Sequence, residues 1–501
     1  MKSKQIKSIL LIVSIFFSIS FNSLIIAEYS SQNDTPGPIT FETYTKYYEN
    51  LEKIEDITII YPRSSIPVIL SQNQSFTIQF QSISFDQLTA TISTAYDSLI
   101  DTIVLEINSI VEKENIHYAT VSIPEYTPSE FYNLTITIKN DEKTISTTRP
   151  RAICVKDTLS DSFSFVHLTD FHIGDPRGLI ENPREIIGWK AARKTVEEIN
   201  LLNPDFVLIS GDLTFGQLYP FEYSFEYPKC YEILQDFTVP TYLCPGNHDG
   251  YIQTFQDGFK FWEDYFGPLY YSFDYHNTHF LSINSYDWPA KARIGFSYLV
   301  FNWGGSIREN QLNWIENDLS NHTEANQTFM MMHHNPLWNT KEDSLFGNGY
   351  YNQQEILNLI RTKHVDAVFD GHVHYDNITE DNNTLYVTTT TASSSLEKDG
   401  YWGYRLVNVE NGSITEYNYE EPDRSIPSYQ INIINEESNS VTIENKLQKP
   451  INIHYEFIVP NKEYTVNTGE IIQSREKDDM AAIYVKATIN AETTETITLL
   501  Q

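Results

Sequence analysis

The sequence predicts an α/β domain that lies between two all-β domains. Residues 159–420 alternate short apolar runs with segments of helical spacing, and this order indicates βαβ units in a layered α/β domain. Residues 56–158 and 421–501 contain short β-prone runs, which favour sandwiches of immunoglobulin-like type. At 501 residues and 41% hydrophobic content, the chain can bury the cores of several domains.

Residues 1–27 are predicted to be a secretory signal peptide. Three lysines precede an apolar run from Ile9 to Phe17, and small or polar residues continue to Ala27. An uncleaved membrane anchor is the alternative, because Ile9 to Ala27 approaches the length that spans a bilayer. Residues 28–55 are predicted to be a linker with a short aromatic helical patch, Tyr44 to Leu51. We therefore expect a protein that is secreted or associated with the cell surface or membrane.

The net charge bears on the class of partner, and the cysteine content bears on how the fold is stabilised. The net charge of −33 becomes −36 without the leader, because the leader holds three lysines and no acidic residue. Electrostatic attraction of nucleic acid is therefore not expected. Cys154, Cys230 and Cys244 are an odd set without a CxxC motif, so disulfides are not expected to be the main support of the fold.

The two β domains are predicted from β-prone runs, most of which alternate apolar and polar residues as half-buried strands do. The runs before the α/β domain are Ile57–Tyr61, Ser75–Phe80 and Tyr132–Ile138. The runs after it are Tyr429–Ile433, Ile451–Phe457 and Ala482–Ala487. No cluster of catalytic residue types occurs in these runs.

The α/β domain is predicted from strand-like and helical segments in alternation. The strand-like segments are Ser162–Leu168, Phe206–Ser210, Phe237–Leu243, Phe280–Ile283, Phe329–Met332 and Ala367–Phe369. The helical segments are Glu185–Asn200, Gln311–Leu319 and Gln353–Thr362. In such a domain, ligands bind beyond the carboxyl ends of the strands.

Polar clusters follow five of these strands. They are Asp170-Phe171-His172, Gly211-Asp212, Asn247-His248-Asp249, His333-His334 and Gly371-His372-Val373-His374. Each cluster alone has an ordinary explanation as a cap or a turn. Five of them behind apolar strands are hard to explain as coincidence, and their carboxylate, imidazole and amide groups suit divalent zinc, manganese or iron.

These motifs resemble those of the calcineurin-like metallophosphoesterase superfamily, which are D-x-H, G-D, G-N-H-D/E, H and G-H-x-H. All five are intact, and the resemblance covers about residues 163–417. It implies a four-layer β-sandwich flanked by helices. It also implies a metal-dependent phosphoric ester hydrolase, either a phosphatase or a phosphodiesterase.

The resemblance further implies two divalent metal ions, manganese, zinc or iron. One ion would be held by Asp170, His172 and His374, and the other by Asn247, His333 and His372, with Asp212 as the bridge. His333 is preferred over its neighbour His334, which stays open as the alternative because the spacing to Pro336 aligns either way.

Two cations roughly 3.5 to 4 Å apart lower the pKa of a bridging water, so that a hydroxide can attack phosphorus in line at neutral pH. The resemblance makes His248 the catalytic residue that hydrogen-bonds the phosphate and protonates the leaving alkoxide. A purely structural role is the alternative for His248. Asp249 and His167 are expected to orient neighbouring loops or histidines.

The purple acid phosphatases, one branch of the superfamily, also have a β-sandwich ahead of the catalytic domain. That branch has a tyrosine ligand three residues after the bridging aspartate and lacks the histidine of the first motif. This chain has Phe215 and His172 at these positions, so two divalent ions are expected instead of a ferric-tyrosinate centre.

The predicted function is that of an exported, dinuclear-metal-dependent phosphoesterase that hydrolyses small phosphate mono- or diesters. The alternative is a catalytically idle cell-surface binding protein that keeps the phosphatase-like domain as a scaffold. The intact ligand set favours the enzyme. The substrate and the oligomeric state stay open.

Overall fold

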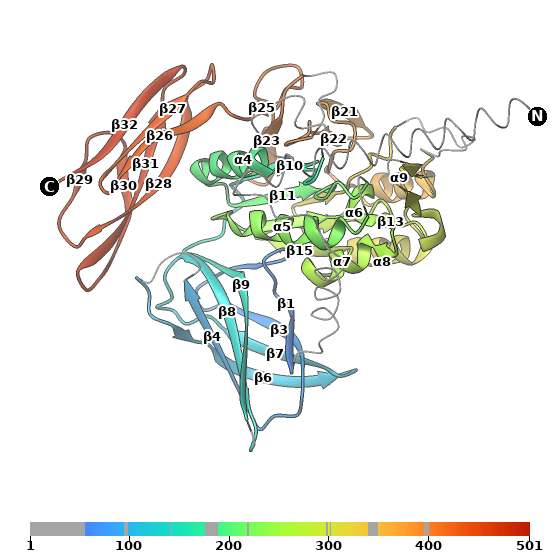
Figure 1. Cartoon of the computed structure of the whole chain (residues 1–501), viewed down its shortest axis with the longest axis horizontal. Coiled ribbons are helices and arrows are strands. Elements are labelled where there is room, and N and C mark those ends of the chain that lie inside the picture. Colours follow the sequence, from blue (N-terminus) through green and yellow to red (C-terminus); the bar gives the residue numbers. More distant parts are fainter. Residues whose placement is uncertain are drawn as a thin grey trace, which may run out of the picture.

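The computed structural model describes residues 56–94, 99–141, 143–175, 189–217, 220–296, 299–300, 302–338, 349–394 and 400–501. An N-terminal β part, a central α/β part and a C-terminal β part follow one another along the chain (Figure 1). The predicted signal peptide, the linker and its helical patch lie outside the described residues. The predicted boundaries near residues 158 and 420 stay predictions.

The N-terminal part is a sandwich of two sheets. One sheet has the order β1 (Ile57–Tyr61), β3 (Ser75–Ser82), β7 (Ile116–Ser122) and β6 (Glu106–Lys113). The other has the order β2 (Val68–Ser71), β9 (Thr144–Lys156), β8 (Glu130–Lys139), β4 (Gln87–Thr94) and β5 (Ile103–Val104). Alternate residues such as Ile78 and Phe80 of β3 and Leu134 and Ile136 of β8 meet in one buried core, as their period of two predicts.

The central part contains two mixed sheets. The first has the order β12 (Thr241–Cys244), β11 (Phe206–Ser210), β10 (Phe163–Leu168), β23 (Gly403–Glu410) and β24 (Ser413–Glu416), and β25 (Ile426–Pro427) pairs with β23. The second has the order β15 (Tyr271–Tyr275), β16 (Thr278–Ser282), β19 (Gln327–Met331), β20 (Ala367–Asp370), β22 (Thr384–Thr388) and β21 (Asn377–Asp381). Strands β10, β11 and β12 are parallel to one another, as are β16, β19, β20 and β22.

The two central sheets share a core rich in aromatic residues. Phe165 and Phe206 of the first sheet contact Phe280 of the second, and Phe165 also contacts Phe369. The other face of the first sheet packs with helices α4 (Trp189–Leu202) and α5 (Tyr223–Gln235). The other face of the second sheet packs with α8 (Glu309–Asn321) and α9 (Gln353–Thr362). Strands β11, β12, β16 and β20 bury both faces, and strands of this kind read as continuous apolar runs.

Short elements connect the strands on the side of the polar clusters. They are α6 (Asn247–Gly250), β13 (Ile252–Gln253), β14 (Gln256–Asp257), α7 (Gly258–Tyr265), the 3₁₀ turn Ala290–Ala292, β17 (Gly295–Phe296) and β18 (Leu299–Val300). Helix α5 was not predicted, because Pro228 lies inside it and proline normally ends a helix. The apolar run from Phe237 also proved longer than the strand, since β12 begins only at Thr241, after Pro240.

The C-terminal part consists of two antiparallel sheets. One has the order β26 (Ile431–Glu437), β27 (Ser440–Asn445), β32 (Thr493–Leu500) and β29 (Thr465–Val466). The other has the order β28 (Ile451–Pro460), β31 (Met480–Ile489) and β30 (Glu470–Lys477). Strand β28 packs against α4 of the central part (Figure 1). Within the described residues, no helix is long and apolar enough to cross a membrane.

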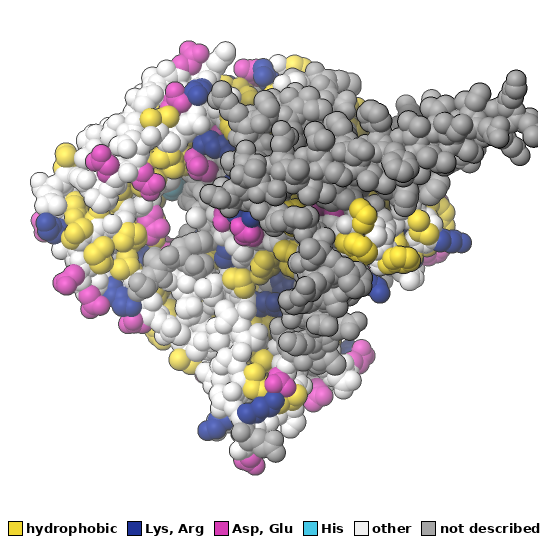
Figure 2. All heavy atoms as spheres, in the orientation of Figure 1, with side chains coloured by type: hydrophobic (Ala, Val, Ile, Leu, Met, Phe, Trp, Pro, Cys, Tyr) yellow, Lys and Arg dark blue, Asp and Glu magenta, His cyan; other side chains and the backbone are white. Residues whose placement is uncertain are grey.

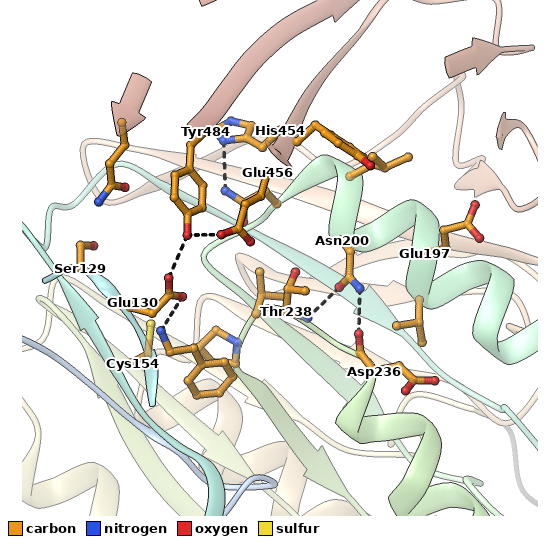
Figure 3. Close-up of a pocket in the computed structure, with 18 of the residues that line it drawn as sticks. Ser129, Glu130, Cys154, Glu197, Asn200, Asp236, Thr238, His454, Glu456 and Tyr484 are labelled. Atoms are coloured by element: carbon orange, nitrogen blue, oxygen red, sulfur yellow. Dashed lines mark hydrogen bonds between the residues drawn. The ribbon is translucent and has the colours of Figure 1, made fainter. Parts of the chain in front are cut away.

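All three parts meet around a cavity of about 670 Å³ (Figure 3). The Tyr484 hydroxyl lies 3.1 Å from Glu130 Oε2 and 2.7 Å from Glu456 Oε1, which joins the first and last parts. On the central side, Asn200 Nδ2 donates to the carbonyl oxygen of Asp236 at 2.8 Å. The β parts therefore contact the central part on the side of α4 and α5.

Candidate metal centre

The polar side chains after strands β10, β11, β12, β19 and β20 meet at the carboxyl ends of these parallel strands. The structure brings together all seven side chains that the sequence predicts as metal ligands and the predicted catalytic histidine. The seven are Asp170, His172, Asp212, Asn247, His333, His372 and His374. All but His372 are more than nine-tenths buried.

Asp170, His172 and His374 form the first group of ligand atoms. Nε2 of His172 and Nε2 of His374 each lie 3.2 Å from Asp170 Oδ1, and they lie 3.2 Å from each other. Ligand atoms about 2.1 Å from one ion lie roughly 3.0 to 3.4 Å apart, so this spacing fits a single ion. Asp170 Oδ2 instead accepts hydrogen bonds from the Thr169 hydroxyl and the His372 backbone amide.

Asp212 lies between the first group and the second. Its Oδ2 is 3.4 Å from His172 Nε2 of the first group and 3.0 Å from His333 Nε2 of the second. Its Oδ1 accepts the backbone amide of His248 at 2.9 Å, which fixes the plane of the carboxylate. One Asp212 oxygen thus faces both groups, as a bridging ligand must.

Asn247, His333 and His372 form the second group. The Asn247 amide donates through Nδ2 to the Tyr251 hydroxyl at 2.5 Å, while the buried Oδ1 has no hydrogen-bond partner among the described residues. Nδ1 of His333 donates to the Ser210 carbonyl at 2.6 Å, and its buried Nε2 faces Asp212 Oδ2 at 3.0 Å. A buried acceptor without a partner is costly, and a bound cation would satisfy Asn247 Oδ1.

His334 is differently placed from His333. Its Nδ1 lies 3.0 Å from the Ser285 hydroxyl and its Nε2 lies 3.0 Å from the carbonyl oxygen of Trp303. A nitrogen that donates to a carbonyl has no lone pair for a metal. This geometry favours His333 as the ligand of the pair, whereas His334 supports the loop that carries Trp303.

The electrostatics of the cluster suit cations. Burial opposes ionisation of Asp170, but the imidazoles of His333 and His374 outweigh it and hold the pKa of that carboxyl well below its usual range. The pKa of Asp212 is likewise lowered, chiefly by His333 and His248 against the effect of burial. Burial and the neighbouring His333 lower the pKa of His372 to about 3, which keeps that imidazole neutral, as metal ligands must be.

Backbone strain is concentrated in this cluster. Asp170, His172, Asp212, His372 and His374 all have positive φ values, between 46° and 72°. Non-glycine residues in this region cost on the order of 1 to 3 kcal/mol each, and such outliers cluster at functional sites. Gly246 permits the close packing here, because a Cβ atom on it would lie 2.1 Å from Asp212 Oδ1.

His248 faces a cavity of about 230 Å³ beside the two groups. Its Nδ1 hydrogen-bonds the carbonyl oxygen of Phe215, and its Nε2 lies 4.0 Å from Asp212 Oδ2. The buried Phe215 ring packs against the imidazoles of His248 and His172. The cavity is lined by Asp212, Gln217, Asn247, His248, Tyr251, Val300, Trp303, His372, Val373 and His374.

The two residues predicted to be supporting have structural partners. Asp249 accepts the backbone amides of Leu213, Thr214 and Gly246, which ties the loop after β11 to the loop after β12. His167 lies between the hydroxyls of Thr389 and Ser210, at 2.7 and 2.8 Å. Both arrangements hold the loops that carry the candidate ligands.

Sequence reasoning did not identify Tyr251 and Trp338 as parts of the site. Tyr251 orients the Asn247 amide, and the Trp338 ring stacks on His372 with centroids 5.7 Å apart. The spacing of four residues between Asn247 and Tyr251 was a usable signal for the first, because such residues lie on one face of a helical turn. Trp338 follows His333 by five residues in a loop, where no periodicity points to its partner.

Comparisons with known proteins agree with this geometry. Residues 163–376 match the family model described as Calcineurin-like phosphoesterase. A probable glycerophosphodiester phosphodiesterase GpdQ of Arcobacter nitrofigilis is 26% identical over 238 residues, which are 47% of this chain and 80% of that protein. Purple acid phosphatase 23 of Arabidopsis thaliana is 26% identical over 212 residues, 36% of this chain and 43% of that protein.

A third relative and one solved structure extend the comparison. A probable cyclic nucleotide phosphodiesterase of Fibrobacter succinogenes is 24% identical over 234 residues, 45% of this chain and 78% of that protein. The solved structure of GAP50, the anchor in the inner membrane complex of Plasmodium, is 15% identical, with a TM-score of 0.36. The structural match covers 53% of this chain and 89% of the GAP50 chain.

Proposed function

We propose, on the premise that residues 163–376 belong to the calcineurin-like phosphoesterase family, that this chain is an exported phosphoesterase that works with two divalent metal ions. The observation that carries the proposal is the placement of Asp212 Oδ2 between two groups of candidate ligand atoms, beside the buried Asn247 Oδ1, which has no hydrogen-bond partner among the described residues. The relatives named as phosphodiesterases and as a phosphatase support the reaction class.

The donor set supports two ions of manganese, zinc or iron, because it combines imidazole nitrogens with carboxylate and amide oxygens. Asp170, His172 and His374 would hold one ion and Asn247, His333 and His372 the other, with Asp212 shared. When bound, two such ions supply a nucleophile at neutral pH by lowering the pKa of water, together with positive charge for phosphoryl oxygens.

His248 would supply the proton for the leaving group. Because its Nδ1 proton is held by the Phe215 carbonyl, the second proton of the imidazolium is carried on Nε2, which faces the cavity. Asp212, 4.0 Å away, stabilises that charged form. An alkoxide that leaves phosphorus within reach of Nε2 would take this proton, which is general acid catalysis.

Several further features of the proposal rest on the sequence and the packing. The two central sheets face each other and each carries helices on its other face, which supports a four-layer arrangement. The leader-like residues 1–27 support export to the outside or to the cell surface. The net charge of −33 supports a small substrate in preference to nucleic acid, and acidic side chains are scattered over the part of the face that Figure 2 draws in colour.

The experiment that tests the proposal is hydrolysis of chromogenic mono- and diesters by the full chain, stripped with a chelator and reloaded with manganese, zinc or iron. We expect activity only after reloading, with diesters the first class to test because two relatives are named phosphodiesterases. Asp212→Asn keeps the shape of the side chain and removes its charge. If Asp212 binds the metal directly, Asp212→Asn should lower metal affinity by more than roughly 10- to 100-fold. That range is typical when the lost residue only hydrogen-bonds a ligand.

The alternative, an idle domain that serves as a binding scaffold, makes the opposite expectation. In that case reloaded protein would hydrolyse none of the esters, and Asp212→Asn would change metal content without changing any activity. If the protein bound two ions per chain but hydrolysed no ester, the hypothesis of a two-ion centre would stand and the hypothesis of an enzyme would be rejected. Fewer than two ions, with normal binding in Asp212→Asn, would reject the shared-carboxylate site itself.

A further inference from the structure

Three consecutive carbonyl oxygens of the loop Asn302-Trp303-Gly304 each accept a hydrogen bond from a side chain. The Tyr286 hydroxyl donates to the first carbonyl oxygen and Trp288 Nε1 donates to the third, both at 2.8 Å. His334 Nε2 donates to the second, the carbonyl oxygen of Trp303, at 3.0 Å. Three donors in succession fix the backbone of this loop and so the position of Trp303.

Ser285 determines the direction of the His334 hydrogen bond. Its Oγ accepts the backbone amides of His333 and His334 at 3.1 and 2.8 Å, so its own proton is left for His334 Nδ1, 3.0 Å away. Nδ1 is then the acceptor, and Nε2 carries the proton that goes to the carbonyl of Trp303. The segment that carries the candidate ligand His333 is thus joined directly to the loop that carries Trp303.

Trp303 is half-buried, packs against the core of the central part and lines the cavity beside His248. Among the described residues, its indole makes no contact with another aromatic ring and its Nε1 makes no hydrogen bond. The other tryptophans whose side chains the structure describes each contact an aromatic or imidazole ring, and they are Trp262, Trp288, Trp314, Trp338 and Trp402. A ring that is held in place at a cavity without such a partner is free to contact a ligand.

The lining of this cavity combines two kinds of side chain. The candidate metal ligands and His248 provide charged and hydrogen-bonding groups, which suit phosphoryl oxygens. Val300, Trp303 and Val373 provide apolar surface. A phosphoester divides in the same way into a charged phosphoryl group and an organic group, and an indole beside the organic group favours a flat ring that can stack on it.

We propose that Trp303 determines substrate specificity by stacking on an aromatic ring in the organic group of the phosphoester. The inference rests on the proposed phosphoesterase and names its substrate class as small esters with an aromatic group. The cavity of about 230 Å³ is smaller than the roughly 300 to 1,000 Å³ of pockets for drug-sized ligands, which favours a small ester. Tyr286, Trp288 and His334 are positioning residues, because they contact the loop and do not line the cavity.

The first test measures binding without catalysis. Benzylphosphonate and cyclohexylmethylphosphonate carry the same charge and are similar in size, but only benzylphosphonate has an aromatic ring. Calorimetric titration of the full chain, reloaded with manganese, should give a Kd about 2- to 10-fold lower for benzylphosphonate. Trp303→Leu should remove this preference, and Trp303→Phe, which keeps a ring, should retain part of it. The matched control is Trp314→Leu, at a half-buried tryptophan of α8 that contacts Tyr270, and it should keep the full preference.

Two variants test the positioning residues. Tyr286→Phe and Trp288→Phe each remove one donor to the loop and keep an aromatic ring. Each should reduce the ratio of the two Kd values, because a loosened loop no longer holds the indole in one place. A merely structural defect would weaken both phosphonates by the same factor and leave the ratio unchanged, which would reject the positioning role.

The role of Trp303 itself is overturned if the unaltered protein binds neither phosphonate, binds both equally, or keeps its preference in Trp303→Leu. Hydrolysis then separates this inference from the proposed function. Benzyl and cyclohexylmethyl phosphates, each as monoester and as methyl diester, have leaving alcohols of similar acidity. We expect kcat/KM to favour the benzyl esters by about 2- to 10-fold in the unaltered protein, and Trp303→Leu to lose this preference.

The two hypotheses fail in different ways. If no ester is hydrolysed but benzylphosphonate is preferred through Trp303, the proposed enzyme is rejected and binding of an aromatic group on Trp303 stands. If the esters are hydrolysed with equal kcat/KM, or with the same preference in Trp303→Leu, the enzyme stands and the role of Trp303 in specificity is rejected.

Discussion

The Asn247 side-chain amide donates a 2.5 Å hydrogen bond to the Tyr251 hydroxyl, and this leaves Asn247 Oδ1 buried and without a partner beside His333. An amide can present either its oxygen or its nitrogen to a metal centre, and only the oxygen binds a cation. The Tyr251 hydroxyl accepts the amide N–H and so determines which end faces the centre. Tyr251 acts on the proposed ion through Asn247.

Tyr251→Phe should therefore weaken the ion held by Asn247, His333 and His372. We expect about a 10- to 100-fold loss of affinity at that position, the usual effect of removing a partner that orients a ligand. Metal content measured against free metal concentration should show one ion that dissociates earlier than in the unaltered protein. The ion held by Asp170, His172 and His374 should be little affected.

A suitable control is Tyr404→Phe, which removes a buried tyrosine hydroxyl that bonds Glu198 on α4, away from the centre. It should leave both ions in place. Equal affinities in the two variants would mean that the Asn247 amide is held by the rest of its loop and that Tyr251 contributes only packing.

Much of the central part could be predicted because its inner strands, such as β11, β16 and β20, are buried on both faces. The predicted segments Phe206–Ser210 and Gln353–Thr362 coincide with β11 and α9, and the polar clusters directly behind the strands converge as parallel topology requires. The positions of Asp170, Asp212 and His372 follow from this local rule.

Features that depend on partners distant in the sequence could not be predicted. His333 and His334 are adjacent, and only the carbonyl oxygens of Ser210 and Trp303 distinguish their ring nitrogens. The stacking of His279 on His322 brings together a strand and the end of a helix that no motif connects. Helix α5 was missed because a local rule about proline was overridden by its burial against the first sheet.

His248→Ala should separate proton transfer from metal binding. The substitution removes Nε2 from the cavity but leaves the backbone amide that donates to Asp212 Oδ1. We expect kcat for an ester with a poor leaving group to fall roughly 10²- to 10⁴-fold, with metal content unchanged. The leaving group of a nitrophenyl ester needs less protonation, so kcat for this ester should fall by a smaller factor. If kcat fell by the same factor for both esters, His248 would not act as the general acid and would only bind the phosphate.

The phenylalanine at position 215 leads to a prediction about the visible absorption of the iron-loaded protein. A phenolate bound to ferric iron gives a visible charge-transfer band, and a phenyl ring cannot supply that ligand. The hydroxyls of the nearby Tyr223 and Tyr251 are bonded to the His248 carbonyl and the Asn247 amide. Iron-loaded protein should therefore show no purple band in its absorption spectrum, and activity should follow divalent metal.

Phe215→Tyr is the informative variant for comparison, because it adds one hydroxyl to a buried ring that packs against His172 and His248. A new visible band in the iron-loaded variant would place the added phenol on the metal. A strong band in the unaltered protein would mean that another tyrosine reaches the iron; Tyr219, a further candidate, lies outside the described residues.

The ion pairs of His279 with Asp274 at 2.6 Å and with Asp318 at 2.8 Å predict how stability depends on pH in protein kept free of metal by a chelator. The pKa of His279 is raised from 6.5 in the unfolded chain to about 9 in the fold, against the effect of burial, by hydrogen bonds to Asp274 and Asp318. A group whose pKa is raised by folding stabilises the fold fully below pH 6.5 and loses that contribution as the pH rises through about 9. The shift corresponds to at most about 3 kcal/mol, and to less in practice because solvent around the exposed Asp274 screens one pair.

His279→Gln should remove this dependence, because glutamine cannot carry the charge. The Tm of the unaltered protein should fall by a few degrees more between pH 6 and pH 9.5 than that of His279→Gln. The same substitution at the exposed His364 is the control and should behave like the unaltered protein. If the Tm difference between the two pH values is the same with and without His279, this imidazole is neutral in the fold, and its two carboxylate partners do not hold a proton on it.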